Sequence, residues 1–171
     1  TSSTGDAEGA LTDLNIDKFP NKTLVINELK NFEGEIEQTP PMHSALKHDG
    51  KPLYQYAREG IEIPRKKRAV TIFSIKLIDL KKDELDLEIE CSKGTYIRTL
   101  AEDIGKKLNV GGYLIGLRRT VVGSLSINNA TSLDLIEESP DVDRLKFINP
   151  IDGFLNNFDS LVVNNDESNA I

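Results

Sequence analysis

The chain has 171 residues, of which 38% are hydrophobic and 29% charged, with a formal net charge of −7. This length is sufficient for one domain with a hydrophobic core. We find neither an apolar run long enough to cross a membrane nor a signal peptide, so we expect a cytoplasmic protein with no membrane partner. Cys91 is the single cysteine, and His43 and His48 have no cysteine at ligand spacing, so we expect no disulfide and no metal.

The charge is unevenly distributed. Residues 41–70 hold seven basic and three acidic side chains, a local net charge of +4 in an acidic chain. A phosphate-binding surface needs only a local basic patch, because salt screens charges beyond roughly 10 Å. Residues 41–70 are therefore either a solvated surface loop or a segment that binds nucleic acid.

The first 33 residues predict a turn followed by a helix. Asp6 lies between Gly5 and Gly9, which is more typical of turn chemistry than of a catalytic carboxylate. A helix is expected over residues 23–32, with Gly34 beyond its end. Its apolar face would carry Val25, Ile26, Leu29 and Phe32.

Residues 38–69 form the most unusual stretch, which we call the thumb. Pro40 and Pro41 interrupt regular structure, and a short helix over residues 52–59 is expected to stop at Gly60. An excursion of about 30 residues inside a compact domain is usually functional or disordered. The tyrosines and basic side chains favour a functional segment that contacts phosphates. The cations and the histidine expected to bind RNA here are His43, Lys47, Lys51, Arg58, Arg65, Lys66, Lys67 and Arg68.

Residues 70–112 predict a hairpin and then a helix. Strands over 70–80 and 84–92 are expected to pair antiparallel, with Leu85, Leu87, Ile89 and Cys91 facing inward. After Gly94, an apolar stripe of helical spacing runs through Ile97, Leu100, Ala101, Ile104 and Leu108. We expect the pair Gly111 and Gly112 to end this helix.

The remainder predicts a strand over 113–122, a short strand over 124–127 and a helix over 130–138. Thr131 or Ser132 would cap this helix, and Pro140 would end it. Anchoring to the domain is expected from Phe147, Ile148, Ile151, Phe154 and Leu155, with a frayed tail over 164–171. The expected fold is α/β of the α+β type: a mixed, largely antiparallel sheet with packed helices, one domain over residues 1–163, and the thumb as an insertion.

Tyr96 and Arg98 lie where the expected strand meets the expected helix. Helix N-termini present free N–H groups and positive potential, so polar side chains there often face a ligand. A strand–helix–strand core with an arginine that merely extends to solvent remains the alternative.

Three short sequence motifs follow one another along the chain. They are Thr4-Gly-Asp-Ala-Glu-Gly9, then Gln38-Thr-Pro-Pro-Met-His-Ser-Ala-Leu-Lys47 with Gly50 to Arg58, then Cys91-Ser-Lys-Gly-Thr-Tyr-Ile-Arg-Thr-Leu100 with Leu117-Arg-Arg119. Together they resemble the TruB-type tRNA pseudouridine synthases, most strongly over residues 32–123. The resemblance implies isomerisation of a uridine in the T-loop of tRNA, at the position conventionally numbered 55, without cofactor or metal. The implied partner is the T-arm of tRNA.

The resemblance also implies roles for particular residues. Arg98 would keep the catalytic aspartate ionised and oriented, Tyr96 would line the uracil site, and Leu117 would contact the base. Arg118 and Arg119 would lie near its phosphate. The catalytic aspartate of the family lies in a loop upstream of the Thr4–Gly9 turn and has no counterpart here, since Asp6, Glu102 and Asp103 are not the nucleophile.

We therefore expect the later part of a pseudouridine synthase catalytic domain. It would need the missing N-terminal half as its partner and would be inactive alone. Two alternatives stay open. One is a non-catalytic module that holds structured RNA through residues 41–70. The other is a relative of the guide-RNA-directed synthases, which share the later motifs but have a shorter thumb, so the full thumb favours the stand-alone bacterial type.

Overall fold

A computed structural model describes residues 1–150, 153 and 159 of the chain. The chain forms two compact units, Thr1–Leu117 and Arg118–Ile171, where the sequence predicted one domain over residues 1–163. The tail expected at 164–171 lies outside the described residues, as do three of the expected anchors, Ile151, Phe154 and Leu155.

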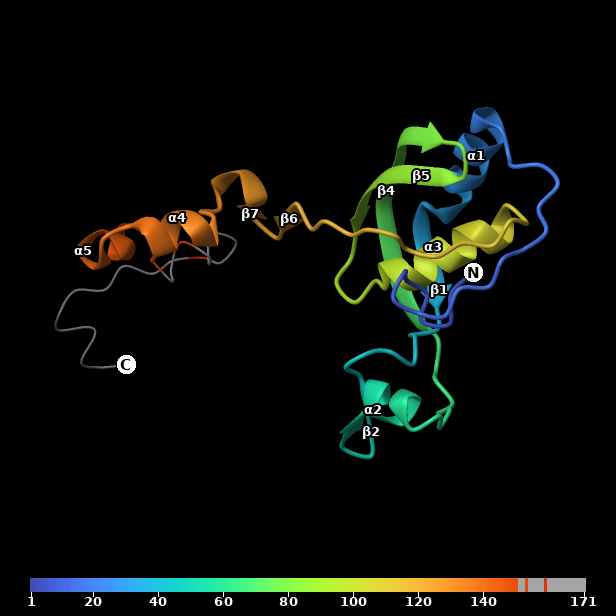
Figure 1. Ribbon diagram of the computed structural model, residues 1–171, viewed down its shortest axis with the longest axis horizontal. Helices are drawn as coiled ribbons and strands as arrows, with labels where there is room; N and C mark the ends of the chain where they lie inside the picture. The colour runs from blue at the N-terminus through green and yellow to red at the C-terminus, as the bar shows by residue number, and fades with distance from the viewer. Residues whose placement is uncertain (151–152, 154–158, 160–171) are drawn as a thin grey trace. The chain divides into compact units, whose positions relative to one another are not determined.

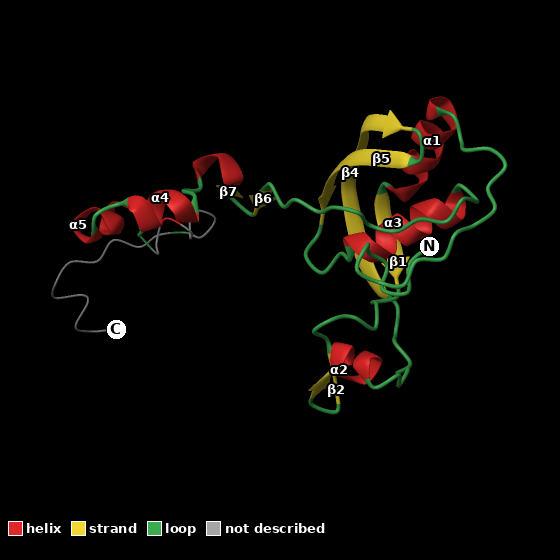
Figure 2. Ribbon diagram, viewed as in Figure 1, coloured by secondary structure: helices red, strands yellow, loops and turns green. Residues whose placement is uncertain are grey.

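The first unit is built on a three-stranded antiparallel sheet in the order β1–β4–β5 (Figure 2). The strands are β1 (Gly34–Gln38), β4 (Arg68–Lys81) and β5 (Glu84–Cys91). The expected hairpin is confirmed as β4 and β5. Strand β1 was not expected. It pairs with the start of β4, from Gly34 opposite Ile72 to Gln38 opposite Arg68.

Two irregularities in the β4–β5 pairing keep the apolar face of β4 directed at the core. The register shifts between Ile72 and Ser74, and again between Leu77 and Asp79. Successive strand residues alternate faces, so without a shift Ile72 and Ile75 would point to opposite sides. With the shifts, both are buried in the same cluster, while Phe73 and Ile78 are exposed. The alternation expected for β5 is confirmed, although Cys91 is only partly buried.

Helices α1 (Lys22–Leu29) and α3 (Ile97–Lys107) complete the core. Val25 and Leu29 of α1 and Leu100, Ile104 and Leu108 in and after α3 pack with the sheet. Ile26, expected on the buried face of α1, is instead 37% exposed.

Helix α3 ends earlier than the glycine pair suggested. Asn109 adopts a left-handed conformation with φ 59°. Its N–H donates to the Lys106 carbonyl, and the Val110 N–H donates to the Gly105 carbonyl, both at 3.0 Å. These two bonds satisfy carbonyls that a helix end otherwise leaves free. Gly105 is required there, because a Cβ on it would lie 2.2 Å from the backbone of Gly111.

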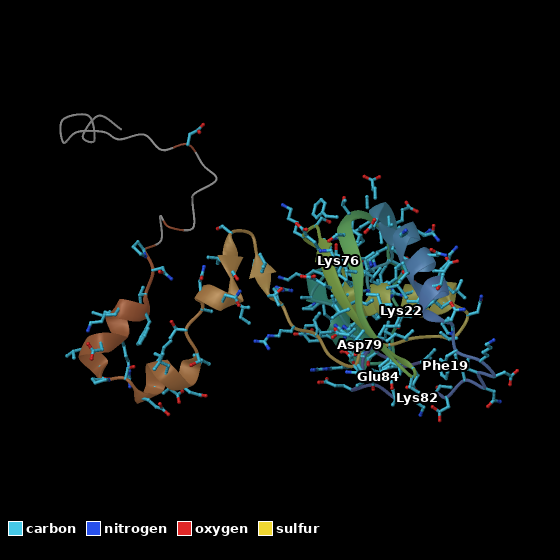
Figure 3. The ribbon with its side chains drawn as sticks, turned by 90° about the horizontal axis from the view of Figure 1, so that it is seen from above. Phe19, Lys22, Lys76, Asp79, Lys82 and Glu84 are labelled. Carbon is cyan, nitrogen blue, oxygen red and sulfur yellow. The ribbon has the colours of Figure 1, made fainter. Side chains whose placement is uncertain are left out.

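The far end of the β4–β5 hairpin is strongly charged. Figure 3 shows Asp79, Lys82 and Glu84 at this end, with Lys22 at the start of α1. Asp79 pairs with Lys81 at 3.1 Å, and this hydrogen bond is the main cause that lowers the pKa of Asp79. These side chains are exposed, so their ion pairs contribute little to stability.

The thumb extends beyond the ends of β1 and β4 (Figure 1). Its short hairpin pairs β2 (Lys47–His48) with β3 (Lys51–Pro52), and α2 (Leu53–Arg58) follows. Asp49 and Gly50 between the strands both have positive φ, which tight two-residue hairpin turns require. The expected helix is confirmed as α2, and Gly60, with φ 72°, follows its end.

The second unit is made of short elements. They are β6 (Val121–Val122), β7 (Leu125–Ser126), the 3-10 turn Ile127–Asn129, α4 (Leu133–Glu138), α5 (Asp141–Arg144) and the 3-10 turn Leu145–Phe147. Ser132, one of the two expected caps, accepts the Leu135 N–H at the start of α4. The Arg144 guanidinium donates to carbonyls at the end of α4.

Candidate active site

The candidate site is built at the junction between β5 and α3. The Ser92 N–H donates to the Thr71 carbonyl at 2.8 Å, and the Ser92 hydroxyl accepts the Thr71 N–H at 2.9 Å. Gly94 then takes φ +84°, a conformation that glycine adopts without strain. This turn leaves Tyr96 extended as the N-cap of α3 and places Arg98 in the first helical turn.

Arg98 connects three segments that are distant in sequence. Its Nη1 donates to Asp6 Oδ2 at 2.9 Å, and its Nη2 donates to the His43 carbonyl at 2.8 Å. The Arg98 and Asp6 side chains are 29% and 23% exposed. Charge-assisted bonds in a partly buried position are among the stronger ones in proteins. Arg98 is thus a fixed group between the N-terminal turn and the thumb, rather than an arginine that only reaches solvent.

Asp6 is held ionised by its surroundings. The Thr4 hydroxyl donates to Asp6 Oδ1 at 2.6 Å, and the Glu8 N–H donates to the same oxygen at 3.2 Å. The Thr4 hydrogen bond, followed by the Glu8 N–H and the Arg98 charge, lowers the pKa of Asp6, while partial burial opposes them. Asp6 does form a turn, as expected, but sequence reasoning missed it as the partner of Arg98. The pairing of Arg98 with a carboxylate from outside the chain stays a prediction.

The same turn fixes the segment that leads to Leu117. The Leu114 N–H donates to the Gly5 carbonyl at 2.9 Å, and the Ala7 N–H donates to the Leu114 carbonyl at 3.0 Å. The strand expected over 113–122 is wrong: apart from this bridge at Leu114, only the two residues of β6 are extended and paired. Gly116 interrupts the segment, and glycine weakens strands. Leu117 is 62% exposed.

A cleft of about 380 Å³ lies between the thumb and the body of the first unit. Met42 and His43 line it from one leg of the thumb and Ile61 and Arg65 from the other, while Thr4 and Glu102 line it from the body. His43 also holds Arg98, and Thr4 holds Asp6. The wall of the cleft is therefore connected directly to the Arg98–Asp6 pair.

The basic residues of the thumb fall into two groups, and those of the first group are bound to other residues of the thumb. Arg65 is 20% exposed and donates to the Ile63 carbonyl, the Pro40 carbonyl and Glu62, so it joins the two legs of the thumb. Lys51 binds Glu59 at 2.5 Å and lies 4.5 Å from the centre of the Tyr56 ring.

The other group is available to a ligand. Within the described ranges, Lys47, Lys66 and Arg68 have no ion-pair partner. Lys67 is exposed and lies 3.4 Å from Glu37, and the Arg58 guanidinium lies over the Tyr54 ring, 5.3 Å from its centre. Arg118 and Arg119 are exposed at the start of the second unit. RNA binding by all these residues stays a prediction.

In the part of the chain that the structure describes, no helix is long and apolar enough to cross a membrane. Nor do three or more His, Cys, Asp or Glu side chains gather there in an arrangement that could hold a metal ion.

Comparisons with known proteins identify the family of the chain. Residues 1–97 match the TruB family pseudouridylate synthase (N terminal domain), and residues 98–162 match the tRNA pseudouridylate synthase B C-terminal domain. A tRNA pseudouridine synthase B from Cupriavidus taiwanensis is 49% identical over 157 residues, which cover 90% of this chain and 50% of that protein. The same-named protein from Dechloromonas aromatica is 47% identical over 155 residues, 91% of this chain and 52% of its own length.

A solved structure, the crystal structure of a Cbf5-Nop10-Gar1 complex, contains a chain that matches with a TM-score of 0.56 and 28% identity. The match covers 71% of this chain and 32% of that one. The chain thus spans about half the length of the curated relatives it matches. On the family matches to residues 1–97 and 98–162, the chain belongs to the TruB family of pseudouridylate synthases.

Proposed function

We propose that these residues are part of a tRNA pseudouridine synthase that isomerises the uridine of the T-loop, at the position conventionally numbered 55. The observation that carries this proposal is Arg98, fixed at the start of α3 between the Asp6 carboxylate and the His43 carbonyl of a basic thumb. A rigid, permanently charged donor beside a cleft suits a reaction whose essential group is a carboxylate.

Arg98 retains the capacity to bind that carboxylate. A guanidinium carries five N–H donors, and Asp6 and His43 each take one. The remaining donors can bind a second carboxylate, which we propose is the catalytic aspartate, contributed from outside these 171 residues. Arg98 would keep this aspartate ionised and hold it in one orientation.

The other expected residues act on the substrate. A uridine in a folded tRNA must leave its stack to be isomerised, at a cost of a few kcal/mol. We propose that Tyr96 and Leu117 contact the displaced uracil. Phosphate contacts would come from the exposed thumb cations, foremost Lys47, Lys66 and Arg68, and from Arg118 and Arg119. These contacts would offset the cost of displacing the base.

The test uses tritium release from a tRNA transcript labelled at C5 of uridine. The chain is compared with a chimera in which the preceding residues of the Dechloromonas aromatica relative are joined to its start. We expect turnover by the chimera, none by the chain alone, and none with a transcript that carries cytidine at position 55. An inactive chimera that nevertheless binds the transcript would contradict the proposed function. Turnover by the chain alone, lost in Asp6→Asn, would show that it carries its own nucleophile.

The two alternatives predict different results in the same assay. A non-catalytic RNA-binding module would bind the transcript in both forms and never release tritium. A guide-directed synthase would need an added guide RNA. The identities of 47% and 49% to proteins named tRNA pseudouridine synthase B, against 28% to the Cbf5 complex chain, favour the stand-alone enzyme.

A further inference from the structure

Gln38 is the most deeply buried polar side chain described, only 2% exposed at the end of β1. Its side-chain oxygen Oε1 accepts the Tyr96 N–H at 3.0 Å, and its Nε2 donates to the Tyr96 carbonyl at 3.4 Å. Both bonds join residues 58 positions apart. A buried amide is costly unless it is hydrogen-bonded, so its partners decide where Gln38 can lie.

The two bonds act on the backbone of one residue, as a neighbouring strand would. Tyr96 is the N-cap of α3, with φ −94° and ψ 105°, outside the helical region. Its N–H therefore has no helical partner, and the Gln38 oxygen satisfies it instead. Because the backbone of Tyr96 sets where its ring points and where α3 begins, Gln38 controls both.

Gln38 also lies where the thumb starts. The chain leaves β1 at Gln38, and five residues later the His43 carbonyl accepts a hydrogen bond from Arg98. The base of the thumb is thus joined to the start of α3 twice, at Tyr96 through Gln38 and at Arg98 through His43.

We infer that Gln38 is a positioning residue, which holds the Tyr96 backbone and thereby orients the Tyr96 ring and Arg98. Its effect on catalysis rests on the proposed function, while its effect on Tyr96 does not. Misplacement of reacting or binding groups by about 1 Å can cost a hundredfold in rate. Loss of the Gln38 amide should therefore lower kcat more than it raises KM.

The first experiment measures hydrogen exchange of backbone amides by NMR on the 171-residue chain. Gln38→Met keeps the approximate length of the side chain and removes both hydrogen bonds. Gln38→Glu keeps an acceptor for the Tyr96 N–H and loses the donor to its carbonyl. Val25→Ala is the control, because Val25 is fully buried on α1, in the hydrophobic core rather than at this junction.

We expect the Tyr96 amide to exchange about threefold to tenfold faster in Gln38→Met relative to the amides of β5, and less so in Gln38→Glu. In Val25→Ala, any change should affect the core amides together. An unchanged Tyr96 amide in Gln38→Met, or an equal increase at every amide, would overturn the inference.

The second experiment measures turnover of tRNA by the chimera. For Gln38→Met we expect kcat to fall about tenfold or more with KM changed by less than about threefold, with partial recovery in Gln38→Glu and wild-type kcat in Val25→Ala. A rise in KM alone would contradict the positioning role. If the unmodified chimera is inactive, the proposed function fails, and the exchange of the Tyr96 amide still decides whether Gln38 holds Tyr96.

Discussion

The Arg98 side chain binds two groups at once, and this depends on its shape as well as its charge. The planar guanidinium reaches a carboxylate with one nitrogen and a carbonyl with another. A lysine ammonium carries the same charge on a single nitrogen and cannot reproduce this fork. Replacement by lysine therefore separates the geometry from the charge.

In the chimera, we expect Arg98→Lys to reduce kcat about a hundredfold while tRNA affinity changes by less than about threefold. Tritium release measures the first quantity and filter binding the second. Arg144→Lys, the same change on α5, is the matched control and should leave kcat unchanged. Unimpaired turnover in Arg98→Lys would remove Arg98 from the active site.

The Asp6 carboxylate has a consequence for the pH dependence of stability. Its folded-state pKa is lowered below the ordinary value of 3.8, chiefly by the Thr4 hydroxyl. A depressed folded pKa gives a stabilisation that is complete well above 3.8 and is lost as the pH falls through the folded pKa. The Asp6–Arg98 pair should therefore remain intact from neutral pH down to about pH 5.

We expect Asp6→Asn to have a lower free energy of unfolding than the wild type, by a constant difference between about pH 5 and pH 8, because the asparagine cannot pair with Arg98 as an ion. As the pH falls through the lowered folded-state pKa of Asp6 the difference should shrink, since the wild-type carboxyl then becomes protonated as well. Urea unfolding at several pH values measures this. A difference that does not shrink at any acid pH at which the chain still folds would show that the charge of Asp6 contributes nothing.

At the scale of the elements, the thumb contains cations that hold its two legs together and cations that are free to bind a ligand. Arg65 is bound to both legs, whereas Lys66 and Arg68 have no ion-pair partner in the described part of the chain. Replacing Lys66 and Arg68 by alanine should weaken binding of a T-arm hairpin and lower the slope of log affinity against log salt by roughly one unit for each phosphate that is no longer bound. Arg65→Ala should instead loosen the thumb.

Titrations of the T-arm hairpin at several potassium chloride concentrations give both affinity and slope. Lys82→Asn is the control: Lys82 is an exposed cation at the far end of the β4–β5 hairpin, and asparagine tolerates its φ of 51°. If the affinity and the slope of the double variant match those of the control, the thumb does not bind the phosphates.

Elements with a long, regular pattern were predictable, and those without one were not. The β4–β5 hairpin and α3 follow from the alternation and helical spacing of their apolar residues. Strand β1 was missed because it has five residues and only Ile36 is apolar. The strand expected over 113–122 was wrong. Its apolar residues suggested a strand partner, whereas Gly116 interrupts the segment, and within the described ranges it has only the bridge at Leu114 and the β6–β7 pair.

Some residues of the candidate site were predictable from the sequence, and others were not. Tyr96 and Arg98 could be found from their place at a strand–helix junction, but Asp6 lies 92 residues from its partner Arg98. The group of His43 that Arg98 contacts is a backbone carbonyl, which any residue possesses. Gln38 reads as one polar residue before a proline-rich stretch. Only the fold shows that these groups meet.

For the molecule as a whole, the sheet of the first unit leaves two strands with an unpaired edge. Among the described residues, β1 and β5 each pair on one side only. Open edges can pair with another chain. We expect the 171-residue chain to self-associate as its concentration rises and the chimera to do so far less, which sedimentation velocity would measure. Equal self-association of both proteins would show that the edges are not its cause.

The register of β1 and β4 has one more consequence. Gln38 and Arg68, at the two ends of the thumb, lie directly opposite each other in the sheet. The thumb therefore occupies the place of an ordinary hairpin turn, and its removal leaves the chain with almost no gap to close. A short Asn-Gly turn in place of residues 39–67 should restore a simple three-stranded meander. We therefore expect that the thumb can be lengthened, shortened or exchanged between relatives while the strands beneath it keep their pairing.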